Sequence, residues 1–202
     1  GYGMMYNHSD DANAEWQIDD DDVRFVCFTA KGAISAAQKA EQDGAQGLMM
    51  LPPMRYKAGD RETVEYFKAV ANNTSLPIMI YNNPVDYKIE VTLDMFEDLL
   101  LCKNIEAVKE STRDISNITR IKNRFGDRLK IMTGVDTIAL ESMLMGADGW
   151  IAGLVCAFPA ETVAAPVLCP KQSTFVCDVI LVVKVVQGLL VHAVKLPAEL
   201  IK

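Results

Sequence analysis

The sequence predicts an α/β protein built on a parallel sheet with helices packed outside it. From residue 23 onward, short apolar runs alternate with segments whose apolar residues recur at helical spacing, and the connections are short. Repeated strand–helix–strand units of this kind form parallel sheets. Two of the apolar runs also release a polar side chain, Tyr81 or Lys109, at their carboxyl end, as strands of such sheets do at a functional site.

Six strands and five helices are predicted in order. Gly44 ends the first helix, Pro52 closes the second strand, Thr92 is placed to cap the third helix, and Gly126 ends the fourth. The predicted helices are 33–43, 60–72, 93–102, 114–125 and 137–145, and the strands are 23–28, 47–51, 129–133, 150–155 and the two runs that carry Tyr81 and Lys109.

Lys109 is the most informative residue. It lies in the run IEAVKEST (residues 105–112), one strand after LPIMIYNNP (residues 76–84), which carries Tyr81. If these strands are parallel neighbours, the amine and the phenol reach the same face. An amine becomes a nucleophile when a desolvated site lowers its pKa, and a phenol can carry protons to and from a carbinolamine. The alternative is that both residues end their strands only for solubility.

Five sequence blocks give the chain a family resemblance. They are GAQGLMMLPP (44–53), LPIMIYNNP (76–84), NIEAVKES (104–111), Thr133-Gly134 and GADGWIAG (146–153). In this order and spacing, residues 23–164 resemble the dihydrodipicolinate synthase and N-acetylneuraminate lyase family, which are class I, pyruvate-type aldolases on a TIM (β/α)8 barrel. The resemblance implies an incomplete α/β barrel here, covering about units three to eight.

The resemblance also implies roles for individual residues. Lys109 would form the Schiff base with a 2-oxo acid, and Tyr81 would relay protons. Gly134 and Ile151 match positions that line the pyruvate pocket, although Gly134 is equally explained as a turn glycine. Arg55, Tyr56 and Asn83, with Arg113, are further substrate-binding candidates on neighbouring loops; surface charge or an interface contact is the alternative for each.

Three departures from the family pattern bear on the activity. The glycine- and threonine-rich loop that holds the pyruvate carboxylate in the family is expected to be missing before residue 23. Asp86 occupies the place where the synthases carry an arginine for a second substrate carboxylate, which disfavours lysine biosynthesis. The forms LPPMRY (51–56), Tyr81-Asn-Asn-Pro84 and Gly149-Trp-Ile-Ala-Gly153 are most similar to the branch that includes deaminases of hydroxyproline breakdown.

Two functions from different classes follow. The first is a Schiff-base-forming lyase or aldolase that acts on pyruvate, another 2-oxo acid or a cyclic imino acid. The second is a catalytically inactive, truncated family member that acts as an interaction or assembly protein, because an incomplete barrel exposes strand edges that pair with other chains.

Composition limits the partners and cofactors. A net charge of −7 and a pI near 4.9 argue against nucleic acid and anionic membranes and favour a small-molecule substrate. The five cysteines have no paired metal spacing and the chain has only two histidines, so we expect no metal and no other cofactor. The odd number of cysteines predicts a cytoplasmic protein, and we expect a homo-oligomer.

The two ends of the chain differ from the predicted lyase domain at 23–164. Residues 10–22 hold seven carboxylates in thirteen positions, so 1–22 are predicted to be a flexible acidic segment, with a cation site as the alternative. Residues 165–202 form a divergent apolar segment, rich in valine at 175–194. A membrane span is one reading of that stretch, but Asp178, Lys184, Gln187 and His192 favour a buried helix, two strands or an altered reading frame.

Overall fold

The computed structural model describes residues 30–53, 56–158 and 162 of the 202-residue chain. The predicted strand at 23–28 and both end segments, 1–22 and 165–202, lie outside these residues. Within them the strands are β1 (Leu48–Met50), β2 (Ile78–Asn82), β3 (Ile105–Glu110), β4 (Lys130–Thr133) and β5 (Gly149–Trp150). The helices are α1 (Ala30–Gln42), α2 (Asp60–Ala71), α3 (Pro84–Tyr87), α4 (Leu93–Leu99), α5 (Ser116–Phe125) and α6 (Ala139–Leu144), with 3₁₀ turns η1 (Asp136–Ile138) and η2 (Leu154–Cys156).

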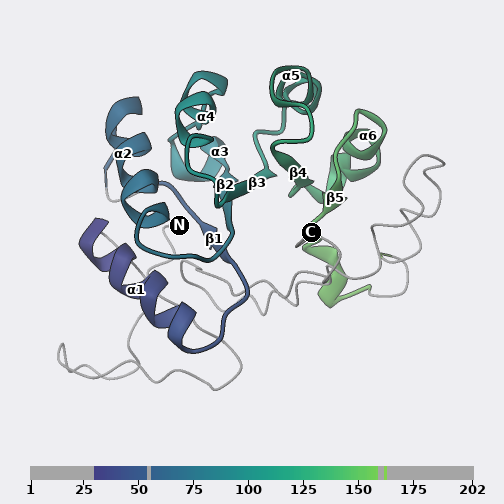
Figure 1. Ribbon diagram of the computed structural model, residues 1–202. Coiled ribbons are helices and arrows are strands. Elements are labelled where there is room, and N and C mark those ends of the chain that lie inside the picture. Colours follow the sequence, from purple (N-terminus) through teal and green to yellow (C-terminus); the bar gives the residue numbers. More distant parts are fainter. Residues whose placement is uncertain (1–29, 54–55, 159–161, 163–202) are drawn as a thin grey trace.

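The five strands form one parallel sheet in the order β1-β2-β3-β4-β5. Helices α2, α4, α5 and α6 lie in a row over one face of this sheet (Figure 1). Every strand therefore pairs with the next one along the chain, after a helical crossover, which is the arrangement of a barrel wall. The predicted α/β class with a parallel sheet is confirmed.

Alternate strand residues supply two apolar clusters on opposite faces. On the outer face, under the helices, Ile80 and Val108 pack in a large core with the helix residues Phe67 and Phe96, all four of them fully buried. On the inner face, the alternate residues of the strands form a smaller cluster. It consists of Met49, Met79, Met132 and Ile151, against which Tyr81 and Ala107 pack. Apolar residues on both faces are typical of parallel strands, and they make the inner face a desolvated floor for polar groups.

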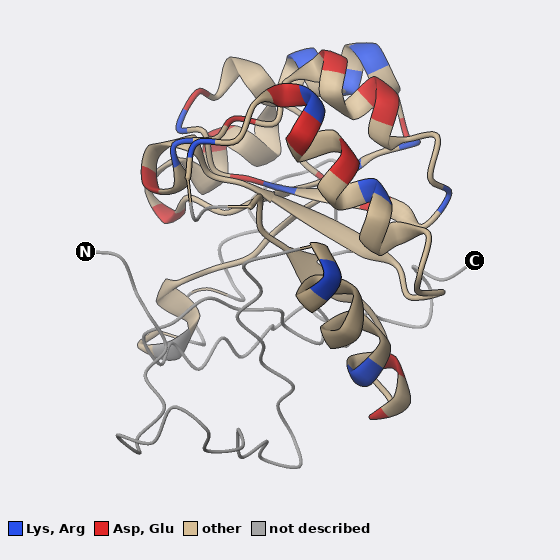
Figure 2. Ribbon diagram, turned by 90° about the vertical axis from the view of Figure 1, so that its left-hand side faces the viewer, with Lys and Arg blue, Asp and Glu red and all other residues tan. Residues whose placement is uncertain are grey.

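Charged residues lie on the helices of the outer layer as well as on the loops. Helix α2, for example, carries both acidic and basic residues (Figure 2). Among the described residues, no helix is both long and apolar enough to cross a bilayer. The valine-rich stretch at 175–194 lies outside that part of the chain.

The predicted strand at 150–155 is wrong beyond Trp150. The sheet ladder continues for one bond, from Ile151 N to Thr133 O at 2.9 Å. The carboxylate of Asp136 then accepts Gly153 N at 2.9 Å and Trp150 Nε1 at 3.2 Å. Because a side chain takes the backbone donor that a ladder would use, the chain turns into η2 instead of extending the sheet.

The segment after Tyr81, predicted as a loop, contains one helical turn, α3. Pro84 occupies the first turn, where its fixed φ suits a helix, and the Asn83 side chain accepts from Asp86 N at 3.4 Å as an N-cap. The predicted cap of the next helix is confirmed, since Thr92 Oγ1 accepts Met95 N at 3.3 Å. That helix ends at Leu99, three residues earlier than predicted.

Candidate active site

The pairing of β2 with β3 places the tyrosine beside the lysine. Tyr81 and Lys109 are register partners, and Lys109 Nζ lies 4.0 Å from the centroid of the Tyr81 ring. Lys109 is only 9% exposed. The predicted adjacency of the two strand ends is confirmed. A buried amine over the face of a phenol ring is held by cation–π attraction and by the apolar floor beneath it.

Gly134 gives the lysine its space. It follows β4, and its amide donates to Glu110 O at 2.9 Å. A Cβ on Gly134 would collide with Ser111 Oγ and would lie 2.7 Å from Lys109 Cε and 2.9 Å from Lys109 Cγ. Gly134 is not among the positive-φ glycines of the described chain, so close packing and not turn geometry requires glycine here.

Ser111 is a further site residue, to which the sequence analysis assigned no role. Its side chain is 97% buried, since only 3% of the residue is exposed, and its Oγ has no hydrogen-bond partner within the described structure. It lies against Gly134, two residues after Lys109. Burying a hydroxyl without a partner costs about 1–3 kcal/mol. A bound ligand that accepts or donates at this oxygen would remove that cost.

Asn83 and Tyr87 surround the other side of Tyr81. Asn83 Nδ2 donates to Tyr81 Oη at 3.3 Å and to Asp86 Oδ2 at 2.7 Å. The Tyr87 ring meets the Tyr81 ring edge-on, at 5.5 Å between centroids and 83° between planes. Burial raises the pKa of Tyr87, and the neighbouring Tyr81 and Asp86 raise it further, so Tyr87 is a neutral phenol at neutral pH. The predicted substrate contact Asn83 thus has its amide N–H groups engaged within the chain.

The other predicted site residues are placed differently. Ile151 is buried in the inner cluster against which Tyr81 packs. Tyr56 is 54% exposed, and its hydroxyl donates to Glu62 in the first turn of α2 and not to Tyr81 or Lys109. Arg113 is exposed, with a left-handed φ of 67°. Arg55 lies outside the described residues.

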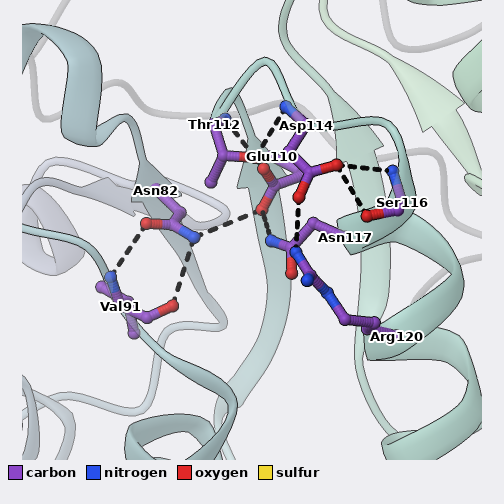
Figure 3. A network of polar contacts seen from close by, with 8 residues as sticks. All are labelled: Asn82, Val91, Glu110, Thr112, Asp114, Ser116, Asn117 and Arg120. Carbon is purple, nitrogen blue, oxygen red and sulfur yellow. Dashed lines mark hydrogen bonds and ion pairs between the residues drawn. The ribbon is translucent and has the colours of Figure 1, made fainter.

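A buried carboxylate stands directly behind the reactive pair. Glu110 follows Lys109 in β3, is 4% exposed and accepts hydrogen bonds from Thr112 N, Asn82 Nδ2 and Asn117 Nδ2 (Figure 3). Burial raises the pKa of Glu110 and outweighs these donors, which lower it. Strand periodicity signals such a residue, because a glutamate two positions after Val108 falls on the apolar outer face and needs partners there.

The arrangement brings together the kinds of group that imine chemistry uses. It combines a buried amine, a phenol ring in contact with it and a buried hydroxyl, next to the apolar cluster of the inner face. No group of three or more histidine, cysteine or acidic side chains within the described residues is arranged to hold a metal ion.

The comparison with known families places this geometry in context. The model of the dihydrodipicolinate synthetase family matches residues 27–163, more than half of the chain. The chain belongs to this family. The match contains β1 to β5 together with Tyr81 and Lys109.

Individual relatives agree with the family match. The chain is 35% identical over 130 residues to a 4-hydroxy-tetrahydrodipicolinate synthase of Aquifex aeolicus, covering 64% of this chain and 44% of that protein. The crystal structure of dihydrodipicolinate synthase from the same organism superimposes with a TM-score of 0.66 at 31% identity, over 69% of this chain and 49% of that one. A sialic acid aldolase of Ruminococcus gnavus, 23% identical, shares the fold with a TM-score of 0.66, over 72% of this chain and 50% of the aldolase.

These relatives define the extent of the match. The chain spans about half the length of the curated relatives that it matches. The described sheet of five parallel strands is an arc of the TIM barrel of these structural neighbours, so the predicted partial barrel is confirmed.

Proposed function

We propose that the protein is a Schiff-base-forming lyase that acts on a 2-oxo acid or a related cyclic imino acid. The observation that carries the proposal is the buried contact of Lys109 Nζ with the Tyr81 ring, at 4.0 Å, on the inner face of a family barrel sheet. The curated relatives of this chain are named 4-hydroxy-tetrahydrodipicolinate synthases, and this supports an enzyme of the same family.

The chemistry follows from the two side chains. The Lys109 amine attacks the C2 carbonyl of the 2-oxo acid, and the carbinolamine loses water to give a protonated imine. When the C3–C4 bond of a 4-hydroxylated 2-oxo acid breaks, its electron pair moves into this imine and leaves an enamine, while the C4 hydroxyl loses its proton and C4 departs as an aldehyde. The enamine takes up a proton at C3, and water hydrolyses the resulting imine to release the product and the Lys109 amine. Tyr81 carries protons between these intermediates and solvent. Ser111 Oγ is free to hydrogen-bond the bound acid.

Asp86 narrows the substrate class. The Asn83 side-chain amide links the Asp86 carboxylate to Tyr81, because Asn83 Nδ2 donates a hydrogen bond to both Asp86 Oδ2 and Tyr81 Oη. An anion at this place repels a second carboxylate on the partner substrate and suits a hydroxyl or an amine. We therefore favour a hydroxylated 2-oxo acid or a cyclic imino acid, in which case the reaction is an aldol cleavage or a deamination.

The test is chemical trapping. The full chain is incubated with pyruvate and borohydride, and the adduct is located by mass spectrometry of the peptide that contains Lys109. The proposal expects the adduct at Lys109 in the wild type and in Lys130→Arg, and its loss in Lys109→Arg. Labelling spread evenly over the surface lysines, or none at millimolar pyruvate, would instead support the inactive interaction protein.

A further inference from the structure

We propose that Glu110 is a positioning residue that holds Tyr81 and Lys109 together by locking the ends of β2 and β3. The inference rests on the proposed imine chemistry for its functional meaning. Glu110 lies on the outer face of the two strands, whereas Tyr81 and Lys109, which would carry the reaction, lie on the inner face.

The register of the strands links the two faces. Tyr81 pairs with Lys109, and the next step of the ladder pairs Asn82 with Glu110. Since successive strand residues point to opposite faces, the first pair lies on the inner face and the second on the outer face. A bond between Asn82 and Glu110 therefore fixes the register of the reactive pair directly behind it.

Every described partner of the carboxylate donates a hydrogen bond. Glu110 Oε1 accepts Thr112 N at 2.8 Å, and Oε2 accepts Asn82 Nδ2 at 3.2 Å and Asn117 Nδ2 at 3.0 Å (Figure 3). The orientation of the Asn82 amide is fixed by the backbone, because Val91 N donates to Asn82 Oδ1 at 2.9 Å. Nδ2 must then face Glu110 and Val91 O, the latter at 3.2 Å.

The network joins four segments around the candidate site. Glu110 binds the end of β2 through Asn82, the β3–α5 loop through Thr112, and α5 through Asn117. Asn82 extends the network to Val91, next to the Thr92 cap of α4. Asn82, Glu110 and Asn117 are each at least 94% buried, so water does not replace the bonds when they are lost.

The central test replaces the acceptor without changing its shape. Glu110→Gln introduces an NH2 group that must face at least one of the three donors. The matched control is Glu106→Gln, which makes the same change at an exposed position of the same strand. Two quantities are measured on each folded protein. One is the rate of borohydride-trapped pyruvate adduct at Lys109. The other is the acetylation of Lys109 by acetic anhydride relative to the exposed Lys103.

The expected result separates positioning from simple support of the fold. Glu110→Gln should slow adduct formation per folded molecule by about tenfold or more, since small misplacements of reacting groups cost this much. It should also change the ratio of Lys109 to Lys103 acetylation. Glu106→Gln should leave both quantities within about twofold of the wild type, as surface substitutions usually do.

A second variant covers the case in which Glu110→Gln does not fold. Asn117→Ala removes one donor and keeps the carboxylate, and Asn123→Ala, exposed on the same helix, is its control. Slower adduct formation and a changed ratio of Lys109 to Lys103 acetylation in Asn117→Ala, but not in Asn123→Ala, would support the proposal. Unchanged values in both variants would overturn it.

The proposal and the function fail in different ways. If the wild type forms no adduct, the proposed function is wrong, and the acetylation ratio alone decides whether Glu110 positions Lys109. If Glu110→Gln lowers the unfolding midpoint but leaves adduct rate and acetylation ratio unchanged, Glu110 is only structural and the inference is overturned.

Discussion

Gly134 leaves the space that the Lys109 side chain occupies, since a Cβ there would approach Lys109 Cε to 2.7 Å. The neighbouring Ser111 brings an unpartnered hydroxyl to the same place. Asn83 in turn presents an N–H to the phenol oxygen of Tyr81. At the scale of single residues, the candidate site thus depends on the missing side chain of Gly134, the unpartnered hydroxyl of Ser111 and the hydrogen bond from Asn83, as well as on the Lys109 amine.

Gly134→Ala should abolish adduct formation at Lys109, because the new methyl group displaces the lysine side chain. Overpacking of this kind typically costs about 1–3 kcal/mol of stability. Gly59→Ala is the control, since nothing lies within 4 Å of its would-be Cβ. Trapping with pyruvate and urea unfolding measure the two effects; equal adduct yields in both variants would contradict the close packing at Gly134.

Tyr81→Phe should slow imine formation by about two to four orders of magnitude, the usual effect of losing a positioned proton donor or acceptor. The ring contacts with Tyr87 and the Lys109 amine remain, so the unfolding midpoint should hardly move. Tyr87→Phe serves as the comparison, because Tyr87 contacts the ring of Tyr81 and not the amine. Equal trapping rates in the wild type and Tyr81→Phe would show that Tyr81 only packs.

Glu110 should give stability a distinct pH dependence. Burial raises its pKa in the folded protein, so the folded state holds this proton more tightly than the unfolded chain does. Its contribution to stability is fully present below the ordinary glutamate pKa and is lost as the pH rises through the raised value. In Glu110→Gln, urea unfolding across acidic pH should lack this decline, while Glu106→Gln should keep it; identical pH slopes in both would refute the assignment.

At the scale of elements, helix ends are held by side chains from distant segments. Arg128, just before β4, donates to Ile105 O at 2.8 Å, Leu100 O at 3.1 Å and Cys102 O at 3.0 Å. Leu100 and Cys102 directly follow α4, and Ile105 is the first residue of β3. The guanidinium therefore caps the end of α4 and links β3 to β4 at the amino ends of the strands, away from the candidate site at their carboxyl ends.

Arg128→Ala should destabilise the protein by about 0.5–1.5 kcal/mol, since it removes the hydrogen bonds to three carbonyls, of which only the bond to Ile105 O is part-buried. Arg128→Lys should recover little, because an ammonium does not reproduce the planar fork. Arg124→Ala is the control: its ion pairs with Asp94 and Glu97 lie at the surface, where such pairs contribute about 0–1 kcal/mol. Equal losses for the two alanine variants in urea unfolding would contradict the capping role.

At the scale of the whole molecule, the described sheet has two edges, β1 and β5. Beside β5, helix α6 exposes Leu140 and Leu144, one turn apart and 50% and 64% accessible. Neighbouring apolar side chains next to a strand edge favour contact with a second copy of the chain.

We therefore expect the 202-residue chain to self-associate at micromolar concentration. Leu140→Lys combined with Leu144→Lys should weaken this association by placing like charges on the α6 surface. Leu101→Lys, at an exposed leucine after α4, is the control. Sedimentation velocity over a concentration series measures the effect. A monomer at all concentrations would contradict this expectation.

Much of this architecture is readable from the sequence by itself. Apolar periodicity predicts the alternation of strands and helices, and the order of the strands predicts that Tyr81 and Lys109 meet, because parallel neighbours end at the same edge. Local signals such as Thr92 and Gly126 mark the helix ends, since a cap or a left-handed residue acts within one turn.

Only the tertiary structure decided the contacts between segments far apart in the chain. The carboxylate of Asp136 ends the strand predicted at 150–155, and the Glu110 network binds β2 and α5. The requirement for glycine at 134 arises from Lys109 and Ser111, at the end of β3. Periodicity specifies which face a residue occupies, but not which distant side chain shares that space, and it is this neighbour that determines the chemistry of the site.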